Sequence, residues 1–418
     1  MTDTRLTRFL LPWLLMLSGF CGISYKILYN RLLGDLLGNQ FFISATVLLT
    51  FLLGIGFGTL YAHRLVRYLW LVEAGIGAYA ALMALAYPWI DKLLYSWIPG
   101  LGGSIYLAAL VAFCLLAAPA FLIGCSVPLF AGYLSSIRTK GVFAIAYGVY
   151  NLGAALTALA LEFVLLRLFG LRLTTLSVAL LNGIVAVGVL WLTRTSPLIP
   201  EPPTTRIRYP ARVLIALAVA SVASAIFQLL LIKIAEFIYG PFNETFALVL
   251  ATVLMGLALG SLAAGRFGLT FNGALLLALA GLAWILTVLP GSIAVYAALY
   301  PRVAENYAAV VSLKLLLMVA LMGLPAIGFG ATIPALIKTY KNMARESGQL
   351  LFCSSVANAF GFMLMAFVLH QYLDYGPILL LVAAMTLAAL VIHSGRLRPA
   401  AAVALVLVGL GGLGYARA

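Results

Sequence analysis

The chain has 418 residues, of which 65% are hydrophobic and only 9% are charged, whereas charged residues make up about a quarter of a typical soluble domain. This composition excludes a soluble globular protein and predicts an integral membrane protein in contact with the lipid bilayer. The net charge of +14 does not indicate nucleic-acid binding, because the basic residues gather at the ends of apolar segments, as they do in membrane proteins.

Apolar segments long enough to cross a bilayer, which takes about 20 residues in a helix, follow one another along the chain. We expect an all-α polytopic membrane protein with helices near residues 9–31, 41–62, 67–90, 104–134, 142–169, 173–193, 211–235, 243–265, 272–295, 308–338, 348–373 and 376–394. A weaker thirteenth segment covers 399–416. Arg5 and Arg8 precede the first segment as in a signal peptide, but it stays apolar past Cys21, so we interpret it as a membrane helix.

The positions of lysine and arginine predict the orientation of these helices. The N-terminus and the segments after every second helix carry most of them: Arg5, Arg8, Arg64, Arg67, Arg138, Lys140, Arg194, Arg206, Arg208, Arg212, Arg266, Lys338, Lys341, Arg345, Arg396 and Arg398. The opposite loops and their flanks hold only Arg31, Lys92, Arg167, Arg172, Lys233 and Arg302. By the positive-inside rule, the N-terminus is cytoplasmic.

Two separate motifs recur at nearly one offset, which indicates an internal duplication. Gly54, Gly58, Thr59 and Arg64 recur 202 positions later as Gly256, Gly260, Ser261 and Arg266, and Pro119, Gly124, Ser126 and Pro128 recur 206 later as Pro325, Gly330, Thr332 and Pro334. Six helices per copy is an even number, so the copies are parallel, as in major facilitator transporters. We expect a first repeat at 1–196, a cytoplasmic linker at 197–210, a second repeat at 211–396 and an extra C-terminal helix at 397–418.

The repeated motifs have different interpretations. The Gly-x-x-x-Gly pairs predict close helix packing, because small residues let backbones approach. Prolines within membrane helices free backbone carbonyls. Pro119, Pro128, Pro325 and Pro334 therefore indicate either hinges of moving, substrate-lining helices or static kinks, and both interpretations remain open.

Ionisable residues within membrane helices are candidates for function because burying charge there is costly. Counting from the helix ends places Lys26, Glu162, Gln228 and Lys314 at a similar level near the external face, together with His370 and bordered by Glu236 and Glu244. This layer predicts a hydrated cavity between the repeats that binds a polar solute. The alternative is that Lys26 and Lys314 extend outward to the interface and that Glu162 neutralises Lys26 or Arg167.

Other polar positions are expected to be structural. Glu73 lies about six residues in from Arg67 and is expected to pair with Arg64 or Arg67 at the interface. Asn151 and Asn358 lie near mid-membrane, where amide side chains usually form hydrogen bonds to a neighbouring helix. Because such amides can also bind a polar solute, we include both among the candidate substrate-binding residues.

Metal and cofactor sites are not expected. The three histidines are scattered in depth, and the four cysteines form no Cys-x-x-Cys pair, so neither a metal, a haem nor a disulfide framework is indicated. Gly409-x-Gly411-x-x-Gly414 matches a dinucleotide fingerprint in letters only, because no strand precedes it and the acidic residue is missing.

A family resemblance covers nearly all of the chain. Its residues are Ser18-Gly19-Phe20, Tyr25, Arg31-Leu32-Leu33-Gly34, Gly54, Gly58, Gly124-Cys125-Ser126-Val127-Pro128, Gly330-Ala331-Thr332-Ile333-Pro334 and Tyr150-Asn151-Leu152-Gly153-Ala154. These are similar to the membrane region of bacterial spermidine synthase-like proteins, in which a major facilitator-like region precedes a soluble aminopropyltransferase domain. The resemblance implies a bacterial or archaeal cytoplasmic membrane. It assigns no catalytic residue, because we find no counterpart of that soluble domain, and Lys26 stands where the family commonly has glutamate.

We therefore expect a transporter-like protein that binds or moves a small polar metabolite, an amine or amino-acid derivative. No catalytic constellation indicates an enzyme. The alternative is a non-transporting membrane module that anchors or serves a separate aminopropyltransferase-like enzyme or a larger membrane complex on the cytoplasmic side.

Overall fold

A computed structural model describes residues 4–38, 41–98, 101, 104–138, 140–195, 209–337 and 343–395. Within these ranges the chain is almost wholly helical and contains no strand, which confirms the predicted all-α class. The predicted helix at 399–416 lies outside the described residues.

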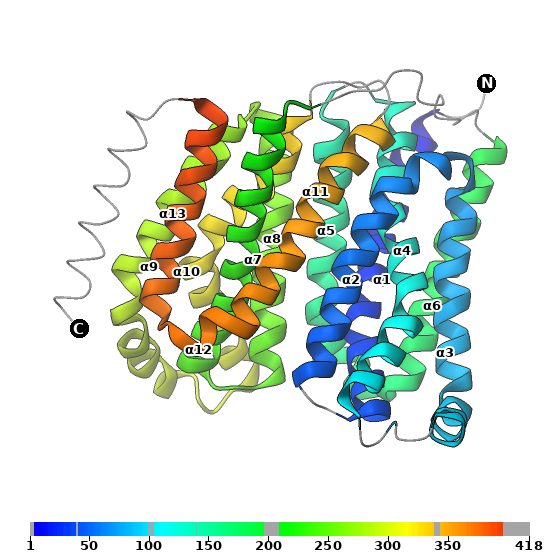
Figure 1. Cartoon of the computed structure of the whole chain (residues 1–418), viewed down its shortest axis with the longest axis horizontal. Helices are drawn as coiled ribbons and strands as arrows, with labels where there is room; N and C mark the ends of the chain where they lie inside the picture. The colour runs from blue at the N-terminus through cyan, green and yellow to red at the C-terminus, as the bar shows by residue number, and fades with distance from the viewer. Residues whose placement is uncertain are drawn as a thin grey trace. The chain divides into compact units, whose positions relative to one another are not determined.

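The chain forms two compact units, one of residues 1–206 with 339–356 and the other of residues 207–338 with 357–418. The first contains α1 (Thr4–Leu37), α2 (Phe41–Tyr61), α3 (Leu69–Trp97), α4 (Ile105–Ser135), α5 (Val142–Ala160) and α6 (Leu166–Thr195). The second contains α7 (Ala211–Tyr239), α8 (Asn243–Phe267), α9 (Phe271–Leu299), α10 (Tyr307–Leu336), α12 (His370–Tyr372) and α13 (Tyr375–Ser394). The helix α11 (Met343–Leu364) begins in the first unit and ends in the second. Figure 1 labels these helices. The boundaries of the sequence repeats stay a prediction.

Eleven segments of the described chain are long and apolar enough to span a membrane. One of them, Val142–Thr195, has 54 residues and would be about 81 Å long as one straight helix, whereas the hydrocarbon core is about 30 Å thick. Gly170 interrupts it with φ +66° and ψ −179°, and the hydroxyl of Thr174 donates to the carbonyl of Leu165 at 3.0 Å across the break. The segment is therefore two crossings, 142–169 and 171–195, as the predicted break after residue 169 requires. The first comprises α5, the turn at Leu161–Leu165 and the start of α6, and the second is the rest of α6.

Gly170 should tolerate no side chain, even though no atom lies within 4 Å of where its Cβ would be. Its φ and ψ lie in a region open essentially to glycine alone. We expect Gly170→Ala to lower the free energy of unfolding by about 1–3 kcal/mol, measured by thermal melting of the purified protein. An unchanged or raised melting temperature would show that the turn relaxes freely.

The Gly-x-x-x-Gly pair of α2 packs against the proline motif of α4. A Cβ on Gly58 would lie 2.0 Å from the carbonyl oxygen of Phe121, and one on Gly124 would lie 2.3 Å from that of Ile55. Because both obstacles are backbone atoms, only glycine lets the two helices approach this closely. This confirms the packing interpretation of the motif.

The second unit repeats this contact between α8 and α10. A Cβ on Gly260 would lie 2.0 Å from the carbonyl oxygen of Ile327, and one on Gly330 would lie 2.4 Å from the Cα of Leu257. Ile327 and Leu257 stand 206 and 202 positions after Phe121 and Ile55, the offsets of the sequence repeat. The duplication thus explains why two distant motifs recur together: they are the two sides of one helix contact.

The four motif prolines lie inside α4 and α10, which stay helical through them. All four are buried. Their role as hinges therefore remains a proposal.

Each unit has a π-helical turn in its described part, Leu161–Leu165 after α5 and Met365–Leu369 after α11. The two turns are 204 positions apart, between the two motif offsets, so the duplication extends to this irregularity. Such turns are rare and frequently occur at functional sites.

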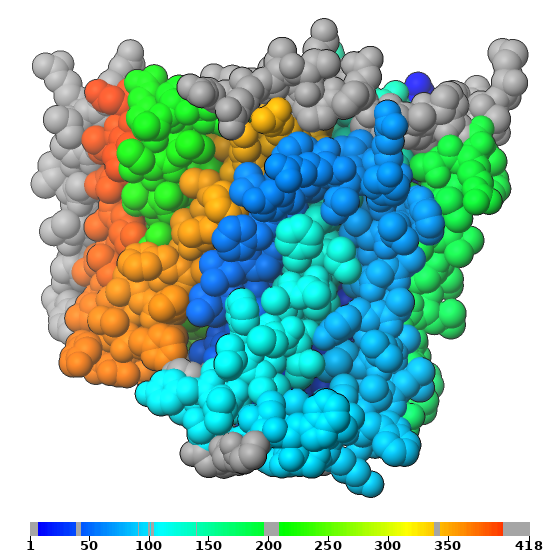
Figure 2. Space-filling view, turned by 45° about the vertical axis from the view of Figure 1, so that its right-hand side comes forward, coloured from blue at the N-terminus to red at the C-terminus, as the bar shows by residue number. Residues whose placement is uncertain are grey.

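The start of α11 packs on α2 within the first unit. Phe57 and Phe352 have ring centroids 5.5 Å apart, and a Cβ on Gly348 would lie 2.2 Å from the carbonyl oxygen of Thr59. Figure 2 shows α11 in orange beside α2 in blue. Residues after the linker therefore complete the first unit.

Candidate functional site

Glu162 forms an ion pair inside the first unit, but with a partner that differs from the expected ones. Its carboxylate accepts a hydrogen bond from the guanidinium of Arg31 at 2.5 Å, so the pairing with Lys26 or Arg167 was wrong. Arg31 itself lies within α1, which continues to Leu37 beyond the predicted end at residue 31. Glu162 occupies the π-helical turn, and the equivalent position of the second unit is Ala366.

Lys26 is half-buried in α1. Among the described residues, it forms no hydrogen bond and no ion pair; the ion pairs found there are Arg31–Glu162, Lys233–Glu236 and Lys314–Glu244. The structure therefore does not join Lys26 to Glu162. A half-buried ammonium that lacks a carboxylate is suited to pair with an anionic group of a ligand.

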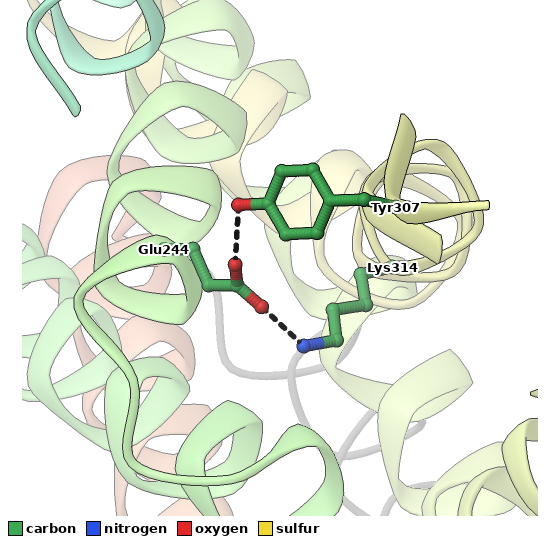
Figure 3. Close-up of polar contacts among 3 residues, drawn as sticks. All are labelled: Glu244, Tyr307 and Lys314. Atoms are coloured by element: carbon green, nitrogen blue, oxygen red, sulfur yellow. Dashed lines mark hydrogen bonds and ion pairs between the residues drawn. The ribbon is translucent and has the colours of Figure 1, made fainter. Parts of the chain in front are cut away.

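Lys314 belongs to a polar cluster in the second unit (Figure 3). Its ammonium lies 2.7 Å from one carboxylate oxygen of Glu244, and the hydroxyl of Tyr307 donates to the other oxygen at 2.7 Å. The ammonium also lies 5.3 Å from the ring centroid of Phe242, a cation–π distance. Only 5% of the Lys314 side chain is exposed, so the expectation that it extends outward to the interface was wrong.

Two of the three candidate amides form hydrogen bonds within their own helices. Gln228 donates to the hydroxyl of Ser224 on its own helix at 3.3 Å, and no described contact joins it to Lys314. Asn151 donates to the carbonyl of Tyr147, also on its own helix, at 2.8 Å, instead of to a neighbouring helix as predicted. The side-chain oxygen of Asn358 is buried, with no hydrogen-bond partner in the described part of the chain.

Glu73 lies at the centre of the first unit and not at an interface. It is fully buried, one turn into α3. Its carboxylate accepts hydrogen bonds from the hydroxyls of Ser18 in α1 and Ser126 in α4, both at 2.8 Å, and from the amide of Asn182 in α6 at 2.6 Å. The predicted pairing with Arg64 or Arg67 was wrong, because the helix presents this side chain to its neighbours.

This cluster was missed by sequence reasoning, although part of its signal was present. Ser18 and Ser126 stand in motifs of the family resemblance, whereas Asn182 is an intramembrane amide outside every motif. Within the described ranges, no three His, Cys, Asp or Glu side chains gather in a group that could hold a metal ion. The chemistry of the cluster is therefore that of one carboxyl group and its hydrogen-bond donors.

Comparison with solved structures decides the fold family. The chain is similar to the major facilitator superfamily proton:xylose symporter XylE bound to 6-bromo-6-deoxy-D-glucose, with a TM-score of 0.54 and 11% identity over 93% of this chain and 95% of the other. The chain has a major facilitator-like fold. At this identity the likeness establishes the architecture and not the substrate.

Sequence comparison gives a partial relative. No family model matches the chain. It is 31% identical over 194 residues to polyamine aminopropyltransferase 2 of Streptomyces coelicolor, a match that covers 44% of this chain and 34% of that protein. The chain thus spans about a third of this curated relative. The resemblance to spermidine synthase-like proteins is supported over this part of the chain.

Proposed function

We propose that this chain is a transporter-like membrane protein that binds and moves a small polar metabolite. The observation that carries the proposal is the major facilitator-like fold, which aligns over 93% of this chain. We also propose that the chain lies in a bacterial or archaeal cytoplasmic membrane with its N-terminus in the cytoplasm, as the distribution of basic residues predicts.

The charges of the candidate residues in the first unit favour a solute that carries a carboxylate. Glu162 is already neutralised by Arg31, whereas Lys26 has no anionic partner among the described residues. A purely cationic amine would meet this ammonium with like charge. An amino-acid derivative, which offers a carboxylate to Lys26, is therefore favoured over a polyamine.

Removal of the Lys26 charge tests this assignment. We expect Lys26→Met to weaken binding or raise the KM for the transported solute by about tenfold or more, because a charge-assisted hydrogen bond contributes about 1.5–3 kcal/mol. Uptake of radiolabelled amino-acid derivatives and polyamines into liposomes that contain the purified chain provides the measurement. Lys92→Met is the matched control, since Lys92 is exposed. Absence of uptake for every candidate, or equal KM values in the two variants, would contradict the proposal.

The partial match to polyamine aminopropyltransferase 2 supports a second candidate, a membrane module that serves a separate enzyme of that class. Affinity purification of the full chain in mild detergent distinguishes the two. A stoichiometric soluble partner favours the module, whereas uptake by the purified chain alone excludes the module as its sole function.

A further inference from the structure

We propose that Glu73 is a protonation site that takes up and releases a proton inside the first unit. The proposal is independent of whether the chain transports a solute. It starts from the position of the carboxyl group, which is 0% exposed and accepts hydrogen bonds from three helices other than its own, α1, α4 and α6. An ionisable residue at membrane depth is costly and requires an explanation beyond packing.

In the described part of the chain, no fixed positive charge is paired with this carboxyl group. None of the ion pairs among the described residues includes Glu73. The titratable groups that interact with it are the thiol of Cys21 and the phenol of Tyr25 on α1 and the phenol of Tyr150 on α5. The groups that face it from α4 and α6, Ser126 and Asn182, are neutral.

The hydrogen-bond partners suit both protonation states. The Asn182 amide donates to one carboxylate oxygen at 2.6 Å and to the Glu73 backbone carbonyl at 3.1 Å, while the hydroxyls of Ser18 and Ser126 both donate to the other oxygen. A hydroxyl can donate or accept. When this oxygen is protonated, its O–H donates to one serine, whose own hydrogen turns to a carbonyl of its helix. Arginine or lysine in place of a serine would not permit this exchange.

Unpartnered hydroxyls continue from this site along one face of α1. Tyr25 and Tyr29 follow Ser18 by 7 and 11 residues, so each lies within about 20° of Ser18 around the helix, on opposite sides of it, over a rise of about 16 Å. Both tyrosines are 0% exposed, and neither hydroxyl has a hydrogen-bond partner in the described part of the chain. Such groups are rare in proteins and mark positions for ordered water. These two hydroxyls extend the row of buried hydroxyl groups that begins at Ser18.

The second unit has the same architecture without this chemistry. The positions 202 and 204 residues after Glu73 are both leucines, Leu275 and Leu277. Phe227 and Leu231 stand 202 positions after Tyr25 and Tyr29. The counterparts of Ser126 and Asn182 are Thr332 and Thr386, whose hydroxyls bond carbonyls of their own helices at 2.7 Å. The repeat therefore folds without the carboxyl group, which argues against a purely structural role for Glu73.

Infrared difference spectroscopy of the full chain in lipid nanodiscs tests the proposal directly. On acidification, the wild-type protein should gain the C=O stretch of a protonated carboxyl group in a dry environment, and this band should be lost in Glu73→Gln. Glu162→Gln is the matched control and should retain the band, because the proposal assigns the band to Glu73 and Glu162 forms a separate ion pair with Arg31. The same samples are checked for folding by size-exclusion chromatography.

Three outcomes are distinguished. A reversible, pH-dependent band that disappears only in Glu73→Gln supports the site. A band that is absent from the wild type, that persists in Glu73→Gln or that stays constant at every pH overturns it. If Glu73→Gln does not fold, Glu73→Asp serves in its place, and the proposal then requires the band to shift in frequency in that variant.

Discussion

Gly58→Ala and Gly260→Ala are expected to destabilise the protein severely, each by about 3 kcal/mol or more, because an added methyl group overlaps a backbone carbonyl that cannot move without separating two helices. The Cβ would lie 2.0 Å from the oxygen of Phe121 in the first unit and 2.0 Å from that of Ile327 in the second. The measurement is the melting temperature of the detergent-purified variants, together with their yield from membranes.

Each of these variants has a matched control within its own unit. Gly183 in α6 and Gly291 in α9 have no atom within 4 Å of the position of a Cβ, and neither has a positive φ. We expect Gly183→Ala and Gly291→Ala to leave the melting temperature unchanged or to raise it, since alanine favours helix by up to about 1 kcal/mol over glycine. Equal melting temperatures for all four variants would show that the close contacts are not needed for stability.

The fold was predictable because its determinants are local. A membrane helix is recognised by its apolar length, and the residues that join α2 to α4 are glycines whose spacing survives the duplication. The break at Gly170 was also visible as a polar interruption between residues 169 and 173. None of these features requires knowledge of which helices are neighbours.

The candidate site was predicted less well because it depends on side-chain direction and on distant partners. Counting residues from Arg67 placed Glu73 near the interface, yet the face of α3 that carries it points into the bundle, toward serines 55 and 53 positions away. Lys314 and Glu244 were both noticed at a similar level. Their pairing across 70 positions is not encoded in either local sequence.

Loss of one partner of the Lys314–Glu244 pair is expected to be among the most costly single changes. The two side chains are 5% and 17% exposed and lie 2.7 Å apart, so removal of one leaves the other charge buried and uncompensated. Breaking such a pair costs about 3–5 kcal/mol. We expect Lys314→Met and Glu244→Gln each to lower the free energy of unfolding by this amount, measured by thermal or denaturant unfolding in detergent.

The double variant and an exposed pair complete the experiment. In Lys314→Met with Glu244→Gln, no unpaired charge remains, so the loss should be clearly smaller than the sum of the two single losses. Lys233 and Glu236 are 42% and 30% exposed and lie 3.4 Å apart, and Lys233→Met should cost about 0–1 kcal/mol.

The same variants decide between a structural and a ligand-binding role for Lys314. The membrane depth estimated for Lys314 from the sequence predicted that it binds solute. In that case, Lys314→Met should reduce binding in a protein of nearly wild-type stability. If Lys314 only pairs with Glu244, stability should fall in Lys314→Met, the loss in the double variant should be smaller than the sum of the single losses, and the folded double variant should still bind solute. The contact of the ammonium with Glu244, and the second bond from Tyr307 to that carboxylate, favour the structural outcome. Of the two candidate lysines, Lys26 is then the one without a carboxylate partner among the described residues.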